Sequence, residues 1–276
     1  MRSAVLRGRE HLVLGEIAAM GEGCAGAAIS LGGARKTYRF TDPNEDAALF
    51  AYGETGWIVG LADGHRGFEA SEVAVDHVLA NPAPHWTESN VIDPERWELY
   101  ALAVFNDAND EILREVARSP KFGTRTTLAL AWVVPAQDRL FYAAIGDSHI
   151  FRVTDRHAED LAVRETADDH TYFLGHAPET AEKLQKKCSV GSLPLGDTRA
   201  VVLASDGLSE QRIGVVDPEA AVLDAVDRAQ LENPGVRPIS TARRVVATAM
   251  DAQHGNRAGD NICTAVLWVR DCLSFG

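Results

Sequence analysis

Four short segments of the sequence place an acidic residue where an apolar run meets a polar stretch. Asn-Glu-Asp at 44–46 precedes one run, Asp63 ends the next, Asp206 ends a third and Asp260 precedes the last. Carboxylate oxygens are the ligands that Mg²⁺ and Mn²⁺ prefer, and one shared carboxylate can hold two such ions roughly 4 Å apart. The pattern predicts a centre of two divalent cations at which the pKa of a bound water is lowered.

Taken singly, each segment has an ordinary explanation. Asp-Gly is a common turn dipeptide, Asn-Glu-Asp is compatible with a polar turn, and a histidine such as His65 is more often a hydrogen-bonded surface residue than a catalyst. The glycine after Asp63 and the one after Asp206 remove a Cβ, which lets a backbone carbonyl or a ligand approach closely. The prediction therefore depends on the combination of the four segments.

The elements that must position these carboxylates follow from the spacing of apolar residues. Apolar runs bounded by turn residues predict β-strands at 27–31, 47–52, 57–62, 126–134, 139–153, 200–204 and 262–269. A helical period predicts helices over 68–79, 93–119 and 239–250, and another from Asp217 onward. Asp93 and Asp217 are each followed by Pro and Glu, which is typical of a helix start. Helices in pairs between groups of strands predict two antiparallel sheets with helices outside them.

The size and charge of the chain limit its organisation and its partners. With 276 residues, 46% of them hydrophobic, the chain is expected to form a single domain over 1–276. Residues 1–26 are interpreted as an N-terminal extension packed on the domain edge, and the polar stretch 154–198 as a flap-like loop region. A net charge of −13 argues against nucleic acid or an anionic membrane as partner. Part of this acidity is explained by a solvated surface and part by carboxylates gathered around metal.

The cysteines and the apolar segments predict a soluble, cytoplasmic protein. The four cysteines have no CxxC spacing and are expected to be reduced thiols, not a disulfide framework or a zinc site. The apolar stretch 11–14 is too short for a signal peptide, and the longest apolar run, 128–136, is half as long as a membrane span.

Seven blocks of the sequence, in one order, resemble the metal-dependent Ser/Thr protein phosphatase family, type 2C. They are Asn-Glu-Asp-Ala at 44–47, Gly-Leu-Ala-Asp-Gly-His at 60–65, Gly-Thr-Arg-Thr-Thr-Leu at 123–128, Ala-Ile-Gly-Asp-Ser at 144–148, Asp-His-Thr at 169–171, Leu-Ala-Ser-Asp-Gly-Leu at 203–208 and Asp-Asn-Ile-Cys-Thr at 260–264. The blocks span nearly the whole chain. The resemblance implies an α+β fold, a four-layer α-β-β-α sandwich of two antiparallel sheets flanked by helix pairs.

The resemblance also implies which residues hold metal. Two tightly bound Mg²⁺ or Mn²⁺ ions would be held by one set of residues: Glu45, Asp46, Asp63, Gly64, Asp206 and Asp260. Asp63 would bridge both ions, and Asp206 and Asp260 would complete one site. The Gly64 carbonyl would bind the other ion, with Glu45 and Asp46 reaching it directly or through water.

Two further roles are carried over from the family. His65 would be the general acid that protonates the leaving serine or threonine oxygen. The arginine that binds the substrate phosphate in the family would fall at Thr41, so Arg39 is the nearest candidate and Arg35 or Lys36 are alternatives.

Asp147 has two interpretations, and three residues depart from the family pattern. Asp147 lies within the apolar run 139–153, where a buried carboxylate needs a partner. That partner is either a local N–H or hydroxyl, or a weakly held third metal ion shared with Asp206. Arg66 stands where the family often has a second glycine, Arg125 interrupts the Gly-Thr-Thr block, and His149 replaces the arginine that usually follows Gly-Asp-Ser. These departures concern phosphate recognition and leave the metal carboxylates in place.

The sequence therefore predicts a phosphatase that hydrolyses phosphoserine or phosphothreonine with a metal-activated water. Its partner would be a phosphorylated protein that a Ser/Thr kinase supplies. One alternative is a pseudophosphatase that binds phosphoproteins or regulates them, but the loss of metal aspartates expected of it is not seen. Another is a hydrolase of small phosphomonoesters, which would need an enclosed pocket.

Overall fold

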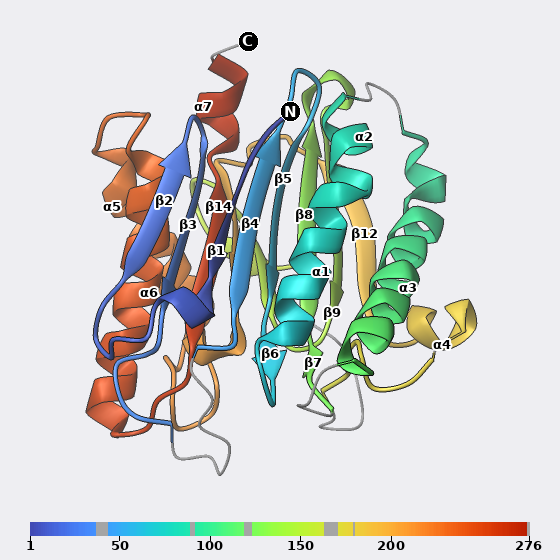
Figure 1. Cartoon of the computed structure of the whole chain (residues 1–276). Helices are drawn as coiled ribbons and strands as arrows, with labels where there is room; N and C mark the ends of the chain where they lie inside the picture. The colour runs from blue at the N-terminus through green and yellow to red at the C-terminus, as the bar shows by residue number, and fades with distance from the viewer. Residues whose placement is uncertain (37–43, 89–91, 119–122, 163–170, 179, 275–276) are drawn as a thin grey trace.

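Two six-stranded antiparallel sheets lie face to face in a computed structural model of the protein, with helices on the outer face of each sheet (Figure 1). The structure describes residues 1–36, 44–88, 92–118, 123–162, 171–178 and 180–274. This is the four-layer α-β-β-α sandwich, and the predicted fold class is confirmed.

The first sheet has the strand order β1-β4-β5-β8-β9-β12. Its strands are β1 (Arg2–Arg7), β4 (Ala47–Tyr52), β5 (Trp57–Ala62), β8 (Leu128–Val134), β9 (Arg139–Ile145) and β12 (Cys188–Pro194). β8 is buried on both faces and reads as an uninterrupted apolar run, because a sheet covered on both sides needs no polar alternation. A two-stranded ribbon of β6 (Gly64–His65) and β7 (Arg125–Thr126) lies at one end of this sheet (Figure 1).

The second sheet has the strand order β11-β10-β13-β14-β3-β2. Its strands are β11 (Ala158–Asp160), β10 (His149–Val153), β13 (Ala200–Ala204), β14 (Ile262–Leu267), β3 (Ala25–Ser30) and β2 (Ala18–Glu22). Apolar side chains form three layers, one between the two sheets and one between each sheet and its helices. Successive side chains of a strand point alternately into the layer between the sheets and the layer under the helices. Phe50 and Leu61 lie between the sheets, whereas their neighbours Leu49 and Ala62 face the helices of the first sheet.

The helices form the two outer layers. The first sheet is covered by α1 (Glu69–Ala80), α2 (Pro82–Glu88), α3 (Trp97–Val116) and the short α4 (Ala181–Gln185), the second sheet by α5 (Pro218–Gln230) and α6 (Arg237–Asn256), and α7 (Val269–Ser274) follows β14. The helix start predicted at Asp217 is confirmed, because Asp217 accepts from the N–H of Ala220 at 2.9 Å. At the other predicted start, Asp93 accepts from the N–H of Glu95 at 3.0 Å and caps a short 3-10 turn, and α3 itself begins four residues later.

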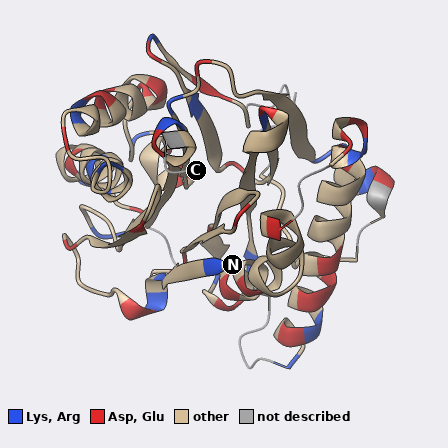
Figure 2. Ribbon diagram, turned by 90° about the horizontal axis from the view of Figure 1, so that it is seen from above, with Lys and Arg blue, Asp and Glu red and all other residues tan. Residues whose placement is uncertain are grey.

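Charged side chains are spread over the outer layers. Figure 2 shows Asp and Glu along the helices, interspersed with Lys and Arg. Exposed ion pairs such as Asp224–Arg228 on α5 belong to this surface, which agrees with a solvated acidic exterior. No helix in the described ranges combines the length and the apolar character needed to cross a membrane.

The predicted single strand over 139–153 is wrong. The chain forms β9 in the first sheet, turns at Gly146 and continues as β10 in the second sheet. Gly146 has a φ of 113°, and a Cβ at this position would overlap the side chain of Thr127. Both strands are buried, so apolar spacing alone does not reveal that the chain changes sheets between them.

The interpretation of residues 154–198 as a loop region is also wrong in part. This range contains β11, α4 and β12, and β12 pairs with β9 along its whole length. The sequence of β12, Cys-Ser-Val-Gly-Ser-Leu-Pro, is rich in residues that are depleted in strands but tolerated at a sheet edge. Likewise, residues 1–26 contribute edge strand β1 to the first sheet and edge strand β2 to the second.

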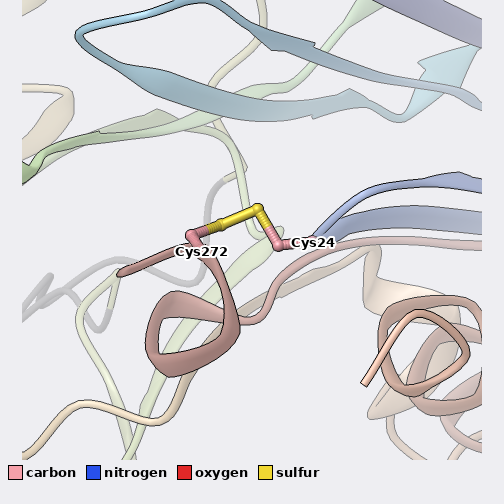
Figure 3. Close-up of a disulfide and its surroundings, with 2 residues drawn as sticks. All are labelled: Cys24 and Cys272. Atoms are coloured by element: carbon pink, nitrogen blue, oxygen red, sulfur yellow. A yellow bond between two sulfur atoms is a disulfide. The ribbon is translucent and has the colours of Figure 1, made fainter. Parts of the chain in front are cut away.

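The expectation of four reduced cysteines is wrong for two of them. Cys24, between β2 and β3, forms a disulfide with Cys272 of α7, and their Cα atoms are 5.4 Å apart (Figure 3). Cys188 and Cys263 take no part in a disulfide. The partners are 248 residues apart, so spacing alone could not indicate the pairing. The predicted cytoplasmic location rested in part on reduced thiols, and this bond removes that part of its basis.

Replacing Cys24 and Cys272 together by Ser is expected to lower the free energy of unfolding by about 2–4 kcal/mol, because the bond restricts the unfolded chain. Urea denaturation of the oxidised protein and the double variant measures this difference. The disulfide is at α7, at the end of the sandwich opposite the β6–β7 ribbon (Figure 1), so the double variant changes the protein away from that ribbon. Cys263→Ser, at a cysteine outside the disulfide, is the control. Equal stability of the wild-type protein with and without reductant would show that the bond contributes nothing.

Candidate metal centre

Strand pairing in the first sheet brings Asp46 and Asp63 to the same end of the sandwich. β4 and β5 are antiparallel, and Ala47, the first residue of β4, lies opposite Ala62, the last residue of β5. Asp46 directly precedes β4 and Asp63 directly follows β5. The two carboxylates therefore leave neighbouring strands side by side, and Glu45, one residue before Asp46, lies at the same sheet end.

The second sheet repeats this arrangement with Asp206 and Asp260. β13 and β14 are antiparallel neighbours. Asp206 begins the 3-10 turn that follows β13 (η4, Asp206–Leu208), and Asp260 lies two residues before β14. One carboxylate oxygen each of Asp206, Glu210 and Asp260 lie within 4.8 Å of one another. Each sheet thus supplies acidic residues from a pair of adjacent strands.

Hydrogen bonds between the two sheets hold these acidic segments together. The Ser205 hydroxyl donates to Asp46 Oδ2 at 2.9 Å and accepts from the N–H of Cys263 at 3.0 Å. The N–H of Glu45 donates to Asn261 Oδ1 at 3.0 Å. Because Ser205 and Asn261 adjoin Asp206 and Asp260 in the sequence, both contacts fix the carboxylates of one sheet relative to those of the other.

The threonine block of β7 and β8 fixes the backbone of Asp63. The N–H of Thr127 donates to the Asp63 carbonyl at 2.9 Å, and the hydroxyl of Thr126 donates to the same carbonyl at 2.8 Å. In return, the N–H of Asp63 donates to Thr127 Oγ1 at 3.0 Å. Three hydrogen bonds thus orient Asp63, so these threonines position the site without providing a ligand.

A cavity of about 690 Å³ brings most of the predicted site residues together. Its lining residues are Lys36, Glu45, Asp63, Gly64, His65, Arg66, Arg125, Asp147, Thr171, Phe173, Asp206, Glu210 and Asp260. Asp46 lies behind this lining, where it is 1% exposed and bonded to Ser205. The cavity therefore combines an acidic cluster with His65 and two arginines.

Burial and mutual repulsion make the ionised carboxylates unfavourable without a cation. Burial raises the pKa of Asp63 well above its usual value, and the charges of Asp46 and Asp206 raise it further. Burial likewise raises the pKa of Asp206, with Asp260 and Asp147 adding to it. The pKa of Asp46 is raised to about 7, mainly by burial.

Lys36 supplies one positive charge to this cluster. Its ammonium lies 2.8 Å from Asp260 Oδ1 and 3.2 Å from Glu45 Oε2. Burial opposes its charge, but Asp260 and Glu45 outweigh burial and raise the pKa of Lys36. Lys36 is therefore engaged by the carboxylates, which does not favour its predicted alternative role in binding phosphate.

The residues present fit a pair of divalent cations. Asp46 Oδ1 is buried and has no hydrogen-bond partner among the described residues, which is costly for a carboxylate oxygen unless a cation is near. Asp206, Glu210 and Asp260 already converge within ligand spacing. The donors are all oxygen atoms, which suits Mg²⁺ or Mn²⁺ better than softer metals.

Asp147 lies elsewhere in the fold than the sequence predicted. It is exposed in the turn between β9 and β10, not inside a strand, so the argument from a buried, unpaired carboxylate is wrong. Its Oδ2 accepts from the hydroxyl of Thr171 at 2.5 Å. Asp147 nevertheless lines the cavity beside Asp206, so a share in a third metal site stays a prediction.

The predicted phosphate-binding residue and part of one motif lie outside the described residues. This applies to Arg39 and to Asp169 and His170. Conversely, two residues that line the cavity, Glu210 and Phe173, are not among those predicted from the sequence. Glu210 lies four residues after Asp206, and a spacing of four residues can place two carboxylates close together. That spacing could have indicated Glu210 from the sequence. Phe173 contacts His65, with ring centroids 5.2 Å apart, and no local pattern indicated it.

Comparisons with known proteins give the family and the fold of the chain. A family model described as protein phosphatase 2C matches residues 35–238. Stp1 of Staphylococcus aureus, a serine/threonine phosphatase, is 20% identical with a TM-score of 0.61, over 94% of this chain and 97% of that one. The serine/threonine phosphatase PstP/Ppp of Mycobacterium tuberculosis is 22% identical with a TM-score of 0.58, over 91% and 97%. A serine-threonine phosphatase 2C of Toxoplasma gondii is 16% identical with a TM-score of 0.62, over 93% and 99%. A comparison with curated proteins gives no match.

The solved structures show the fold, and the family model identifies the class. The sandwich and its acidic cluster are those of a metal-dependent protein serine/threonine phosphatase. Because the model matches more than half of the chain, the protein belongs to the protein phosphatase 2C family. The resemblance predicted from the seven sequence blocks is confirmed.

Proposed function

We propose that the protein hydrolyses phosphoserine and phosphothreonine in protein substrates with two divalent cations held by carboxylates of both sheets. The observation that carries the proposal is the convergence of Asp63, Asp206 and Asp260 from three separate segments on one cavity. Asp46 is hydrogen-bonded through Ser205 to the same cluster. A family fold alone would not imply activity, but these retained carboxylates supply the charge that cations require.

The roles of the carboxylates are carried over from the family pattern. Asp63 would hold both ions, Asp206 and Asp260 would hold one of them as well, and the Gly64 carbonyl with Glu45 and Asp46 would hold the other. When bound, the cations supply a water of lowered pKa and offset charge at the phosphoryl group. Glu210 and Lys36 adjust the charge beside Asp260.

We propose that His65 donates a proton to the leaving oxygen of serine or threonine. It lines the cavity two residues after Asp63, and its ring rests against Phe173. An alkoxide leaving group needs such a proton because it is a strong base. Arg39 remains the proposed phosphate contact from the family pattern, and Asp147 with Asp206 the proposed site of a weaker third ion.

Divalent-dependent turnover is the direct test. Hydrolysis of a phosphothreonine peptide is expected to disappear in chelator and to return with Mn²⁺ or Mg²⁺, because the described site offers no nucleophile of its own that replaces a bound water. The released phosphate is measured at several concentrations of each metal. Robust turnover in chelator would contradict the proposal. Binding of phosphopeptide without turnover would favour a pseudophosphatase, and turnover of small phosphomonoesters alone would favour the other alternative.

We also propose that the substrate is a protein phosphorylated by a Ser/Thr kinase, whose activity this phosphatase opposes. Both would act in the cytoplasm. The Cys24–Cys272 disulfide provides a test of the location. Alkylation of the protein in intact cells, followed by mass spectrometry, measures the oxidised fraction. A largely oxidised pair would contradict a reducing compartment, where disulfides are rare.

A further inference from the structure

Two of the departures from the family pattern meet at one place in the fold. Arg125 lies directly opposite His65 in the β6–β7 ribbon, and Arg66 is the next residue after His65. Both arginines line the cavity. Two departures that are 59 positions apart in the sequence thus add two positive charges near each other in a cavity whose other charged residues are six carboxylates and Lys36.

The Arg125 side chain is held in place but incompletely satisfied. Its guanidinium lies 4.6 Å from the centre of the Phe173 ring, which also contacts His65. Its Nε is buried and has no hydrogen-bond partner among the described residues. Burial lowers the pKa of Arg125, and the charge of Arg66 lowers it further, so the two guanidiniums repel each other. An anion between them would relieve both costs.

The backbone of Arg66 indicates that its side chain is used. Arg66 has a φ of 68°, a left-handed conformation that glycine adopts freely and other residues adopt at a cost. The side chain is exposed and lines the cavity, so it lies at the cavity rim. Glycine would satisfy the turn without strain, and arginine adds a charge at the cavity rim.

The order of residues along the ribbon places this pair relative to the reaction. Asp63 is the residue that would hold the cations. His65 follows two residues later, and Arg66 and Arg125 lie beyond Asp63 at the level of His65. If His65 protonates the leaving oxygen, the arginines lie on the leaving-group side, where the peptide chain of the substrate continues. This step rests on the proposed function.

We propose that Arg66 and Arg125 bind an acidic side chain next to the phosphorylated residue, so that the enzyme selects acidic phosphorylation sites. Arginine suits this task because its planar guanidinium pairs with an oxyanion through two parallel hydrogen bonds. The net charge of the protein, −13, repels an acidic peptide. The arginine pair supplies the local attraction that such a substrate needs.

The test compares two phosphothreonine peptides that differ only in Glu or Gln at the positions beside the phosphothreonine. For the wild-type enzyme with Mn²⁺, kcat/KM is expected to be about fivefold to tenfold higher for the Glu peptide, as for a partly exposed, charge-assisted contact. Arg125→Met and Arg66→Gly are each expected to reduce this ratio, and the double variant to bring it near one. Arg125→Lys retains part of it because the charge remains.

Two controls make the result specific. Arg228→Met removes an equal charge from the outer helix α5, where Arg228 pairs with Asp224, and is expected to keep the wild-type ratio. Arg66→Gly relieves the left-handed strain, so its loss of preference is not attributable to misfolding. Raising the salt concentration is expected to lower the ratio, since exposed charges are screened.

Several outcomes would overturn the inference while leaving the proposed function intact. A wild-type enzyme that turns over both peptides equally with Mn²⁺ lacks the preference. Equal losses in Arg125→Met on both peptides and on nitrophenyl phosphate would assign Arg125 to the reacting phosphate instead. Absence of metal-dependent turnover of either peptide by the wild-type enzyme is a separate result, which counts against the proposed function itself.

Discussion

Asp63→Asn is expected to lower kcat for a phosphopeptide by about 10³-fold or more, because the bridging charge acts on both cations and a loss of several kcal/mol corresponds to that factor. The substitution keeps the shape of the side chain and the hydrogen bonds of the Asp63 backbone to Thr126 and Thr127. Calorimetric titration with Mn²⁺ should show weakened binding at the tight sites. Asp224→Asn, the same change on the exposed face of α5, is the control and should leave kcat unaltered.

The same variant is expected to be at least as stable as the wild-type protein when no metal is present. Burial, Asp46 and Asp206 raise the pKa of Asp63 in the folded state, so the folded protein retains protons that the unfolded chain loses. The stability of the metal-free wild type therefore falls as pH rises above about 3.9, the ordinary aspartate pKa. Asp63→Asn removes one contribution to this fall. Thermal unfolding in chelator at several pH values measures it.

A wild-type kcat in Asp63→Asn would show that the bridge is assigned wrongly. Loss of activity together with a lower unfolding temperature in chelator would instead indicate a scaffold role. A lower kcat combined with equal or higher stability in Asp63→Asn is expected for a residue that is retained for function although it destabilises the fold.

The sequence predicted the strands that carry the carboxylates because their signals are local. β4 and β5 have the predicted bounds, since each is an apolar run ended by an acidic or glycine-containing turn. β13 also coincides with its predicted range. The end of each run is where Asp46, Asp63 and Asp206 occur, so predicting the strand also located the carboxylate. Antiparallel pairing of β4 with β5 then brings Asp46 and Asp63 together, whereas Asp206 reaches them only through the packing of the second sheet on the first.

What the sequence did not reveal depends on contacts between distant segments. The change of sheet at Gly146 requires knowing that Thr127 occupies the space beside it. The Cys24–Cys272 bond joins the two ends of the chain. Lys36 was considered for phosphate, yet Asp260, more than two hundred residues later, holds its ammonium. None of these partners is visible in a local window of sequence.

His65→Ala is expected to lower kcat for a phosphoserine peptide by about 10²–10⁴-fold, the usual contribution of a general acid. Nitrophenolate is a weak base that leaves without a proton, so the loss on nitrophenyl phosphate should be much smaller. The comparison of both substrates in one variant serves as an internal control for folding and metal content. Equal losses would assign His65 a structural role, such as orienting Phe173 or a neighbouring ligand.

The pH dependence tests the same assignment independently. Burial lowers the pKa of His65, and the charges of Arg125, Arg66 and Lys36 lower it further, so the free enzyme loses the catalytic proton below the ordinary histidine pKa of about 6.5. A bound phosphate dianion offsets these positive charges and raises the pKa again. On the phosphopeptide, kcat/KM should therefore decline with rising pH at a lower pH than kcat does, because the first reports the free enzyme and the second the complex. In His65→Ala this separation should vanish. If both profiles of the wild type decline at the same pH, or the separation survives in the variant, the proton comes from another group.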